Sequence, residues 1–209
     1  MAAGTGKLTR LLAPLGAELI AVEPVAGMAS QLRGACPGVP LAASTAEALP
    51  FSNGALDAIT VAQAFHWFDA RAALREFARA LRPRGRLGLL WNARLRTEPW
   101  VDAVWSVMDR VEREAPWRDH ERWSDAAFVE EPALTQLQEA TFDHSQVLTP
   151  EGVVERVRGV SHVAVLRPYE QREVLNEVRA VLAEHPGSRG RTELEIPYRV
   201  DAYWCERRA

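Results

Sequence analysis

The first residues of the chain form a loop of small side chains that leads into a helix. Its small residues are Ala2, Ala3, Gly4 and Gly6. Such a loop lets a ligand approach the backbone closely. A helix is predicted over residues 8–15 from the spacing of Leu8, Leu11, Leu12 and Leu15, and it would direct free N–H groups at that ligand. Glu23 ends the next apolar run, at a distance after the glycine loop that suits a βαβ unit. A carboxylate at this position can accept hydrogen bonds from both hydroxyls of a ribose. The competing interpretation of Glu23 is a solvated residue at a strand end.

Three classes of ligand use a glycine loop of this kind. A P-loop requires a hydroxyl residue after its lysine and a leading glycine, but Leu8 follows Lys7 and Met1 stands at the leading position. A dinucleotide loop requires a third small residue where Thr9 stands, so NAD is disfavoured. A nucleoside with an amino-acid tail needs only a small loop and an acidic acceptor, and the sequence favours this class.

A second group of candidate residues follows the strand predicted over residues 57–62. Gln63, Ala64, His66 and Trp67 stand there. Open α/β sheets bind ligands at the carboxyl ends of their strands, so these side chains are expected at the site. His66 could take a proton from an oxygen or nitrogen nucleophile, although a packed histidine with satisfied hydrogen bonds is the alternative.

Alternating helices and strands must position these residues. Strands are predicted at residues 18–23, 39–43, 57–62 and 87–91, with helices at 8–15, 28–33 and 70–81 between them. Asp69 is expected to cap the third helix, and Pro83 with Gly85 to end it. The apolar stripe of this helix is Leu74, Phe77, Ala78 and Leu81. This order predicts an α/β fold with a doubly wound, mostly parallel sheet.

The pattern changes after residue 92. An apolar helical stripe that includes Trp100 and Trp105 begins a predicted helical cap over residues 93–140, which also holds Trp117 and Trp123. Trp100 and Trp105 are candidates to contact the substrate, or else belong to the core. Further elements are predicted as strands at 141–148 and 194–202 and helices at 151–158 and 170–184. We therefore divide the chain into 1–92, 93–140 and 141–209, with an antiparallel strand at the sheet edge.

Composition narrows the classes of function. The chain has 209 residues, of which 47% are hydrophobic and 25% charged, and its formal charge of -3 provides no basic field for nucleic acid. No apolar run is long enough for a membrane span. Cys36 and Cys205 show no CxxC spacing and no secretory segment is recognisable, so a cytoplasmic location is expected. The histidines lack the spacing of metal ligands, so no metal is predicted, and nothing indicates an oligomeric state.

Several motifs, in this order, resemble those of class I S-adenosylmethionine-dependent methyltransferases, and specifically the type 11 group. The first is Ala2 to Thr9, followed by Glu23-Pro24 with Met28, Ala46-Glu47-Ala48-Leu49-Pro50-Phe51, the span from Ala62 to Asp69, and Leu81-Arg82-Pro83-Arg84-Gly85. The resemblance implies that S-adenosylmethionine is held by Ala2, Ala3, Gly4, Gly6, Glu23, Pro24, Met28, Thr45, Ala46, Glu47, Gln63 and Ala64. It implies a small-molecule methyl acceptor beside His66, Trp67, Trp100 and Trp105, with His66 as the candidate base.

Two departures from the family pattern bear on this interpretation. Thr45 replaces the acidic residue that often contacts the adenine amine, a role that backbone groups at Ala46 and Glu47 could fill. The aspartate that normally precedes the first motif is absent, and only Met1 stands where a central, buried strand is expected. We therefore expect an upstream segment that supplies this strand, and weak stability and cofactor binding without it.

Methyl transfer from a sulfonium is a direct displacement, in which the protein chiefly aligns the reactants and excludes water. A base is optional, and the sequence leaves the chemical class of the acceptor open. One alternative is a degenerate, non-catalytic module with the same fold. Another, an NAD-dependent oxidoreductase, is disfavoured by Thr9 and by the lack of a Tyr-Lys pair for hydride transfer.

Overall fold

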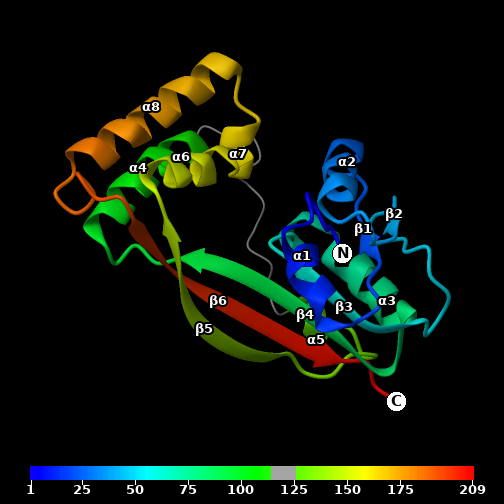
Figure 1. The fold of residues 1–209 in the computed structure, drawn as a ribbon. Helices are drawn as coiled ribbons and strands as arrows, with labels where there is room; N and C mark the ends of the chain where they lie inside the picture. Colours follow the sequence, from blue (N-terminus) through cyan, green and yellow to red (C-terminus); the bar gives the residue numbers. More distant parts are fainter. Residues whose placement is uncertain (114–125) are drawn as a thin grey trace. The chain divides into compact units, whose positions relative to one another are not determined.

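The computed structural model describes residues 1–113 and 126–209, which form two compact units (Figure 1). The first unit holds residues 1–91, 126–141 and 201–209, and the second holds 92–113 and 142–200 of the described chain. Trp117, Trp123 and His120 lie outside the described residues. The described residues 126–140 group with the first unit, whereas our division at residues 92 and 140 into three segments stays a prediction.

Helices and strands alternate through the first unit. Its elements are α1 Lys7–Leu12, the 3-10 helix η1 Ala13–Leu15, β1 Ala21–Val22, α2 Ala26–Ala35, β2 Leu41–Ala42, β3 Leu56–Ala62, η2 Phe65–Trp67, α3 Ala70–Ala80 and α5 Ala126–Val129. The helices of the second unit are α4 Pro99–Arg113, α6 Pro150–Arg158, α7 Ser161–Ala164 and α8 Pro168–Glu184. The strands β4 Leu81–Arg94, β5 Gln138–Leu148 and β6 Leu194–Glu206 contribute residues to both units.

The strands form two sheets among the described residues. β1 pairs in parallel with β2, and the second sheet has the order β3-β4-β6-β5, in which β3 and β4 are parallel. β6 runs antiparallel to β4, because Arg207 N donates to Gly85 O (2.8 Å) while Leu95 N donates to Pro197 O (3.0 Å). The predicted α/β class, with parallel strands and an antiparallel addition, is confirmed.

Residues 1–3 hydrogen bond to a strand of each sheet. Ala3 N donates to Val22 O of β1 (3.0 Å), and the amino group of Met1 donates to Thr60 O of β3 (2.8 Å). β1 is shorter than the strand predicted over residues 18–23, and in the described part of the chain it pairs with β2, which is two residues long. Ile20, just before β1, is 47% exposed.

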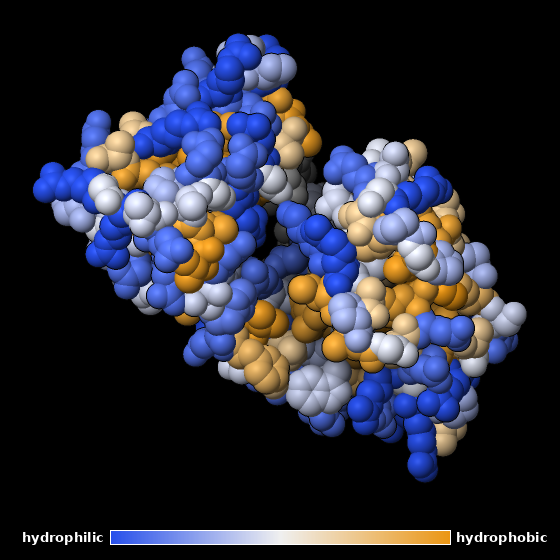
Figure 2. Space-filling view, viewed as in Figure 1, coloured by the Kyte–Doolittle hydropathy of each residue, from blue (hydrophilic) through white to orange (hydrophobic). Residues whose placement is uncertain are grey.

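The first helix begins within one residue of its predicted start, and two leucines of its apolar stripe are exposed. α1 continues into η1 and ends at Gly16, whose φ of 79° lies in the left-handed region that favours glycine. Leu11 and Leu15 are 71% and 74% exposed, and hydrophobic surface is visible in Figure 2 over the unit that contains α1. The helical spacing therefore predicted the helix correctly, and two leucines of the stripe lie at the surface.

Helix α3 agrees with the prediction from its cap to its core face. The side chain of Asp69 accepts a hydrogen bond from Ala72 N (3.0 Å), which satisfies one free N–H of the first turn. Leu74 and Phe77 are fully buried. The helix is thereby fixed in the core of the first unit.

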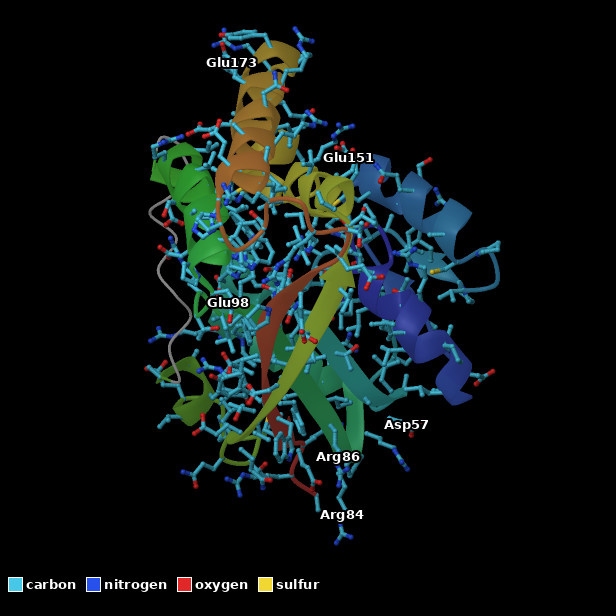
Figure 3. All side chains as sticks on the ribbon, turned by 60° about the vertical axis from the view of Figure 1, so that its left-hand side comes forward. Asp57, Arg84, Arg86, Glu98, Glu151 and Glu173 are labelled. Carbon is cyan, nitrogen blue, oxygen red and sulfur yellow. The ribbon has the colours of Figure 1, made fainter. Side chains whose placement is uncertain are left out.

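Strand β4 begins earlier than predicted. We expected Pro83 and Gly85 to separate α3 from a strand at residues 87–91, but β4 starts at Leu81. Its register with β3 shifts between two pairs, Leu56 with Leu81 and Ala58 with Arg86, so an irregular stretch accommodates Pro83 without a ladder N–H. Arg84 and Arg86 project from this end of β4 in Figure 3.

The second unit has its own hydrophobic core. α4 packs against α7 and α8, and α6 packs against α7 and α8. Trp100 and Trp105 of α4 are buried in this core together with Tyr198 of β6. Helices α4, α6 and α8 confirm the predicted helical segments. None of the helices in the described ranges 1–113 and 126–209 has the length and apolar character needed to cross a bilayer.

Candidate functional site

The loop at the beginning of the chain has the backbone conformation that its small residues permit. Ala2, Gly4 and Gly6 all have positive φ, of 46°, 57° and 84°. Gly6 N donates to Ala3 O (2.9 Å), and α1 begins at the next residue. A Cβ atom on Gly6 would lie 3.2 Å from Cys36 Sγ and 3.3 Å from Leu32 Cγ of α2, so this position combines a left-handed backbone with close packing on α2.

Glu23 lies directly under this loop. Its side chain is 3% exposed, and its two carboxylate oxygens each accept one backbone hydrogen bond: Oε2 from Gly4 N (2.8 Å) and Oε1 from Val25 N (2.9 Å). A carboxylate has about four acceptor positions, so each oxygen retains the capacity for another donor. Glu23 is therefore a buried acceptor at the glycine loop, and the interpretation as a solvated residue at a strand end is wrong.

A basic group also approaches Glu23. The Met1 amino group is buried, and burial lowers its pKa to about 6, while the charge of Glu23 acts in the opposite direction. The hydrogen-bond donors to the Glu23 carboxylate are thus Gly4 N of the glycine loop and Val25 N, just after β1. Pro24 and Met28, predicted beside Glu23, are exposed, and Met28 lies on α2.

The segment from Thr45 to Glu47 is held close to the core. Thr45 is exposed, Ala46 is buried, and Glu47 is half-buried. The Oε1 atom of Glu47 accepts a hydrogen bond from Asp69 N (3.1 Å), at the beginning of α3. Ala46 packs in the same core as Ala64. The predicted adenine segment and the predicted residues after β3 therefore meet in one unit.

The residues after β3 form a tight turn. Gln63 has a φ of 58°, which is uncommon for a residue with a side chain, and its N–H donates to Leu90 O of β4 (2.9 Å). Ala64 is buried. His66 is half-buried and Trp67 is 50% exposed, with ring centroids 4.9 Å apart. His66 is thus partly accessible at the carboxyl end of β3 and does not lie in the buried core.

The two tryptophans predicted to contact substrate belong to the second unit. Trp100 and Trp105 are 3% and 4% exposed. The guanidinium of Arg94 lies 4.8 Å from the Trp105 ring centroid, and the Trp105 Nε1 atom has no hydrogen-bond partner in the part of the chain that the structure describes. The role of both residues stays a prediction.

A cavity of about 180 Å³ is present in the second unit, and α6 and α8 supply much of its lining. Glu151 and Arg179 contribute an ion pair to its wall. None of the residues that we predicted for the site lines it.

The cysteines and the potential metal ligands of the described residues are arranged as follows. Cys36 and Cys205 are buried and free, and burial raises the pKa of the Cys205 thiol to about 12. Within residues 1–113 and 126–209, no group of three or more His, Cys, Asp or Glu side chains is arranged to hold a metal ion.

Some contacts of the site were not anticipated from the sequence. Val25 N shares the Glu23 carboxylate, and Asp69 N binds Glu47. Glu76 and Arg79 of α3 hydrogen bond to the loop that follows Glu47. The spacing of three residues between Glu76 and Arg79 is typical of an ion pair on a helix, but it does not indicate which loop the pair binds.

A sequence model of the methyltransferase domain matches residues 1–89. An uncharacterized methyltransferase of Mycobacterium tuberculosis is 35% identical over 198 residues, which cover 95% of this chain and 78% of the relative.

Two solved structures share the fold. A candidate type II methyltransferase from Anaeromyxobacter dehalogenans has a TM-score of 0.67 and 22% identity, covering 99% of this chain and 87% of that one. The phosphoethanolamine N-methyltransferase 2 of Haemonchus contortus, solved with phosphomonomethylethanolamine and S-adenosylhomocysteine, has a TM-score of 0.55 and 12% identity, covering 100% of this chain and 48% of that one.

Proposed function

Because this chain belongs to the methyltransferase family, we propose that it transfers a methyl group from S-adenosylmethionine to a small organic molecule. The observation that carries the proposal is the buried carboxylate of Glu23 beneath the glycine loop. Its hydrogen bond to Gly4 N joins the two parts of a nucleoside site that the sequence separates by 19 residues.

The residues present fit this cofactor. Glu23 uses one acceptor position on each oxygen for Gly4 and Val25, which leaves one position on each for a ribose hydroxyl. No phosphate has to be cradled, which agrees with the absence of a P-loop hydroxyl after Lys7. The small loop from Ala2 to Gly6 would adjoin the amino-acid tail, and the segment from Thr45 to Glu47 would adjoin the adenine.

When bound, S-adenosylmethionine supplies a methyl group on a sulfonium centre, and the acceptor displaces the sulfur directly. The protein contributes alignment and the exclusion of water. His66 and Trp67, at the carboxyl end of β3, would border the acceptor, and His66 would take up the proton of an oxygen or nitrogen nucleophile. The turn at Gln63, fixed by its hydrogen bond to Leu90 O, holds this segment against β4.

A small acceptor agrees with two observations. The formal charge of -3 gives the chain no basic field for a nucleic acid. The Haemonchus contortus enzyme, which shares the fold, was solved with a small phosphorylated amine.

Calorimetric titration with S-adenosylhomocysteine tests the proposal, with NADH titrated under the same conditions as the competing nucleoside ligand. We expect saturable binding of S-adenosylhomocysteine with one site per chain and no binding of NADH. Binding of NADH in preference to S-adenosylhomocysteine would overturn the proposal. Transfer of labelled methyl groups to members of a small-molecule panel would then identify the acceptor, and binding without any transfer would favour the non-catalytic alternative.

A further inference from the structure

We propose that Glu76 and Arg79 of α3 are positioning residues that set the selectivity of the site for adenine. They would do so by fixing the loop that contains Thr45, Ala46 and Glu47. This inference rests on the proposed function, since it concerns the part of the same site that would bind the base.

The two side chains bind the loop through four of its polar groups. The Glu76 Oε1 atom accepts from Leu49 N (2.7 Å), and Arg79 Nη2 donates to Leu49 O (3.3 Å). Arg79 Nη1 donates to Phe51 O (2.8 Å) and to Asn53 Oδ1 (2.8 Å). Three of these four groups belong to the main chain, so the contacts define the backbone path of residues 49–51 whatever side chains stand there.

Glu76 and Arg79 also hold each other in place. Arg79 Nε donates to Glu76 Oε2 (2.8 Å), and Nη2 donates to Oε1 (2.6 Å), which is the two-point geometry that makes arginine–carboxylate pairs directional. The Glu76 side chain is only 15% exposed, compared with 33% for Arg79. The hydrogen bonds from Arg79 lower the pKa of Glu76, so the carboxylate stays ionised at neutral pH and keeps both contacts.

The same helix holds the other side of the adenine segment. Glu47 Oε1 accepts from Asp69 N, one residue before α3 begins, while Ala46 and Leu49 are buried in the core. Residues 46–49 are therefore fixed at Asp69 at one end of α3 and at Glu76 in its interior. Loss of the hydrogen bond between Leu49 N and Glu76 would let the backbone at Ala46 and Glu47 move relative to the base.

Main-chain groups can distinguish adenine from hypoxanthine only if they are precisely placed. Adenine offers an amino donor at C6 and an acceptor at N1, whereas hypoxanthine offers an acceptor at C6 and a donor at N1. A site that hydrogen bonds one pattern rejects the other because its own polar groups are left unpaired. Loss of the loop geometry should therefore reduce discrimination between the bases, in addition to affinity.

The test measures the affinities of S-adenosylhomocysteine and S-inosylhomocysteine for the wild-type protein and for Arg79→Met. We expect the wild type to prefer the adenine ligand by about tenfold or more. In Arg79→Met the ratio should fall to about threefold or less. A purely structural defect would weaken both ligands equally and leave the ratio unchanged, which would overturn the inference.

Arg71→Met is the matched control. Arg71 is also on α3, but its side chain is 68% exposed and pairs with Glu130, itself 51% exposed. The control should retain the wild-type ratio, and a fall equal to that of Arg79→Met would overturn the inference. If Arg79→Met does not fold, Asn53→Ala removes one loop contact alone, and a ratio below that of the wild type is again expected.

The outcomes separate this inference from the proposed function. Failure of the wild type to bind S-adenosylhomocysteine would remove the proposed function. A wild type that binds both ligands equally, or an Arg79→Met variant that keeps the full preference for adenine, would remove only the role of Glu76 and Arg79.

Discussion

Replacement of Glu23 by alanine is expected to have two separable effects, on the loop and on the ligand. The carboxylate accepts from Gly4 N and Val25 N in the unliganded protein. Each hydrogen bond to a charged group contributes about 1.5–3 kcal/mol, so Glu23→Ala, which removes two of them, should lower the free energy of unfolding by about 3–6 kcal/mol. This part of the effect is visible in thermal or denaturant unfolding without any ligand.

The effect on the ligand comes in addition. Loss of a charge-assisted acceptor for the ribose costs about 1.5–3 kcal/mol, which corresponds to a loss of affinity of about tenfold or more. Loop disorder could also weaken binding, so affinity for S-adenosylhomocysteine alone does not separate the two causes. Its 2′-deoxy analogue does, because it lacks one of the hydroxyls that Glu23 would bind.

The assay is a calorimetric titration of both ligands, at a temperature at which every variant is folded. The wild type should bind the deoxy analogue more weakly than S-adenosylhomocysteine, whereas Glu23→Ala should bind the two with nearly equal affinity. Glu18→Ala, which removes an exposed carboxylate from the segment before β1, should behave as the wild type. Unchanged affinity of Glu23→Ala for S-adenosylhomocysteine would refute the assignment of Glu23 to the ribose.

Three further experiments test other parts of the molecule. His66→Asn should lower turnover and leave affinity for S-adenosylhomocysteine nearly unchanged, if an acceptor proton passes to His66; equal turnover in steady-state assays would exclude this role. Gly85→Ala should destabilise the protein by about 1–3 kcal/mol or more, because the added Cβ would lie 2.8 Å from Arg82 O, while Gly88→Ala, with no atom within 4 Å of its Cβ, should differ from it clearly in denaturant unfolding. Cys205 should resist alkylation at pH 8 until the protein unfolds. Because burial raises its pKa from 9.0 to about 12, the stabilising contribution of the protonated thiol should be lost as the pH rises from about 9 to 12, and prompt alkylation of the native thiol would contradict its burial.

The sequence predicted correctly those features of the fold that depend only on residues close together in the chain. Asp69 caps α3 as expected, because capping depends on neighbours within three residues, and the apolar spacing of Leu74 and Phe77 gave the buried face. The extent of β1 and the start of β4 were predicted wrongly, since each depends on a partner strand distant in the sequence. Pro83 in particular is normally a strand terminator, and only the register shift beside β3 makes it acceptable.

In the candidate site, too, some residues were recognisable from the sequence and some contacts were not. Gly4 and Gly6 were recognisable from their spacing, and Glu23 from its place at the end of an apolar run. The contacts of Glu76 and Arg79 were not, because the loop atoms they bind are main-chain groups, which carry no signature in the side-chain sequence. Whether a leucine on a helical stripe is covered depends on what packs over it, which explains the exposure of Leu11.

A crystal structure with S-adenosylhomocysteine is the most direct test of the central claim, that the Gly4–Gly6 loop and Glu23 form the nucleoside site of a methyltransferase. The account predicts both ribose hydroxyls on the Glu23 carboxylate, the adenine beside Ala46 and Glu47, and the sulfur on the side of His66. Ligand bound elsewhere on the chain, or a ribose that makes no hydrogen bond to Glu23, would contradict it.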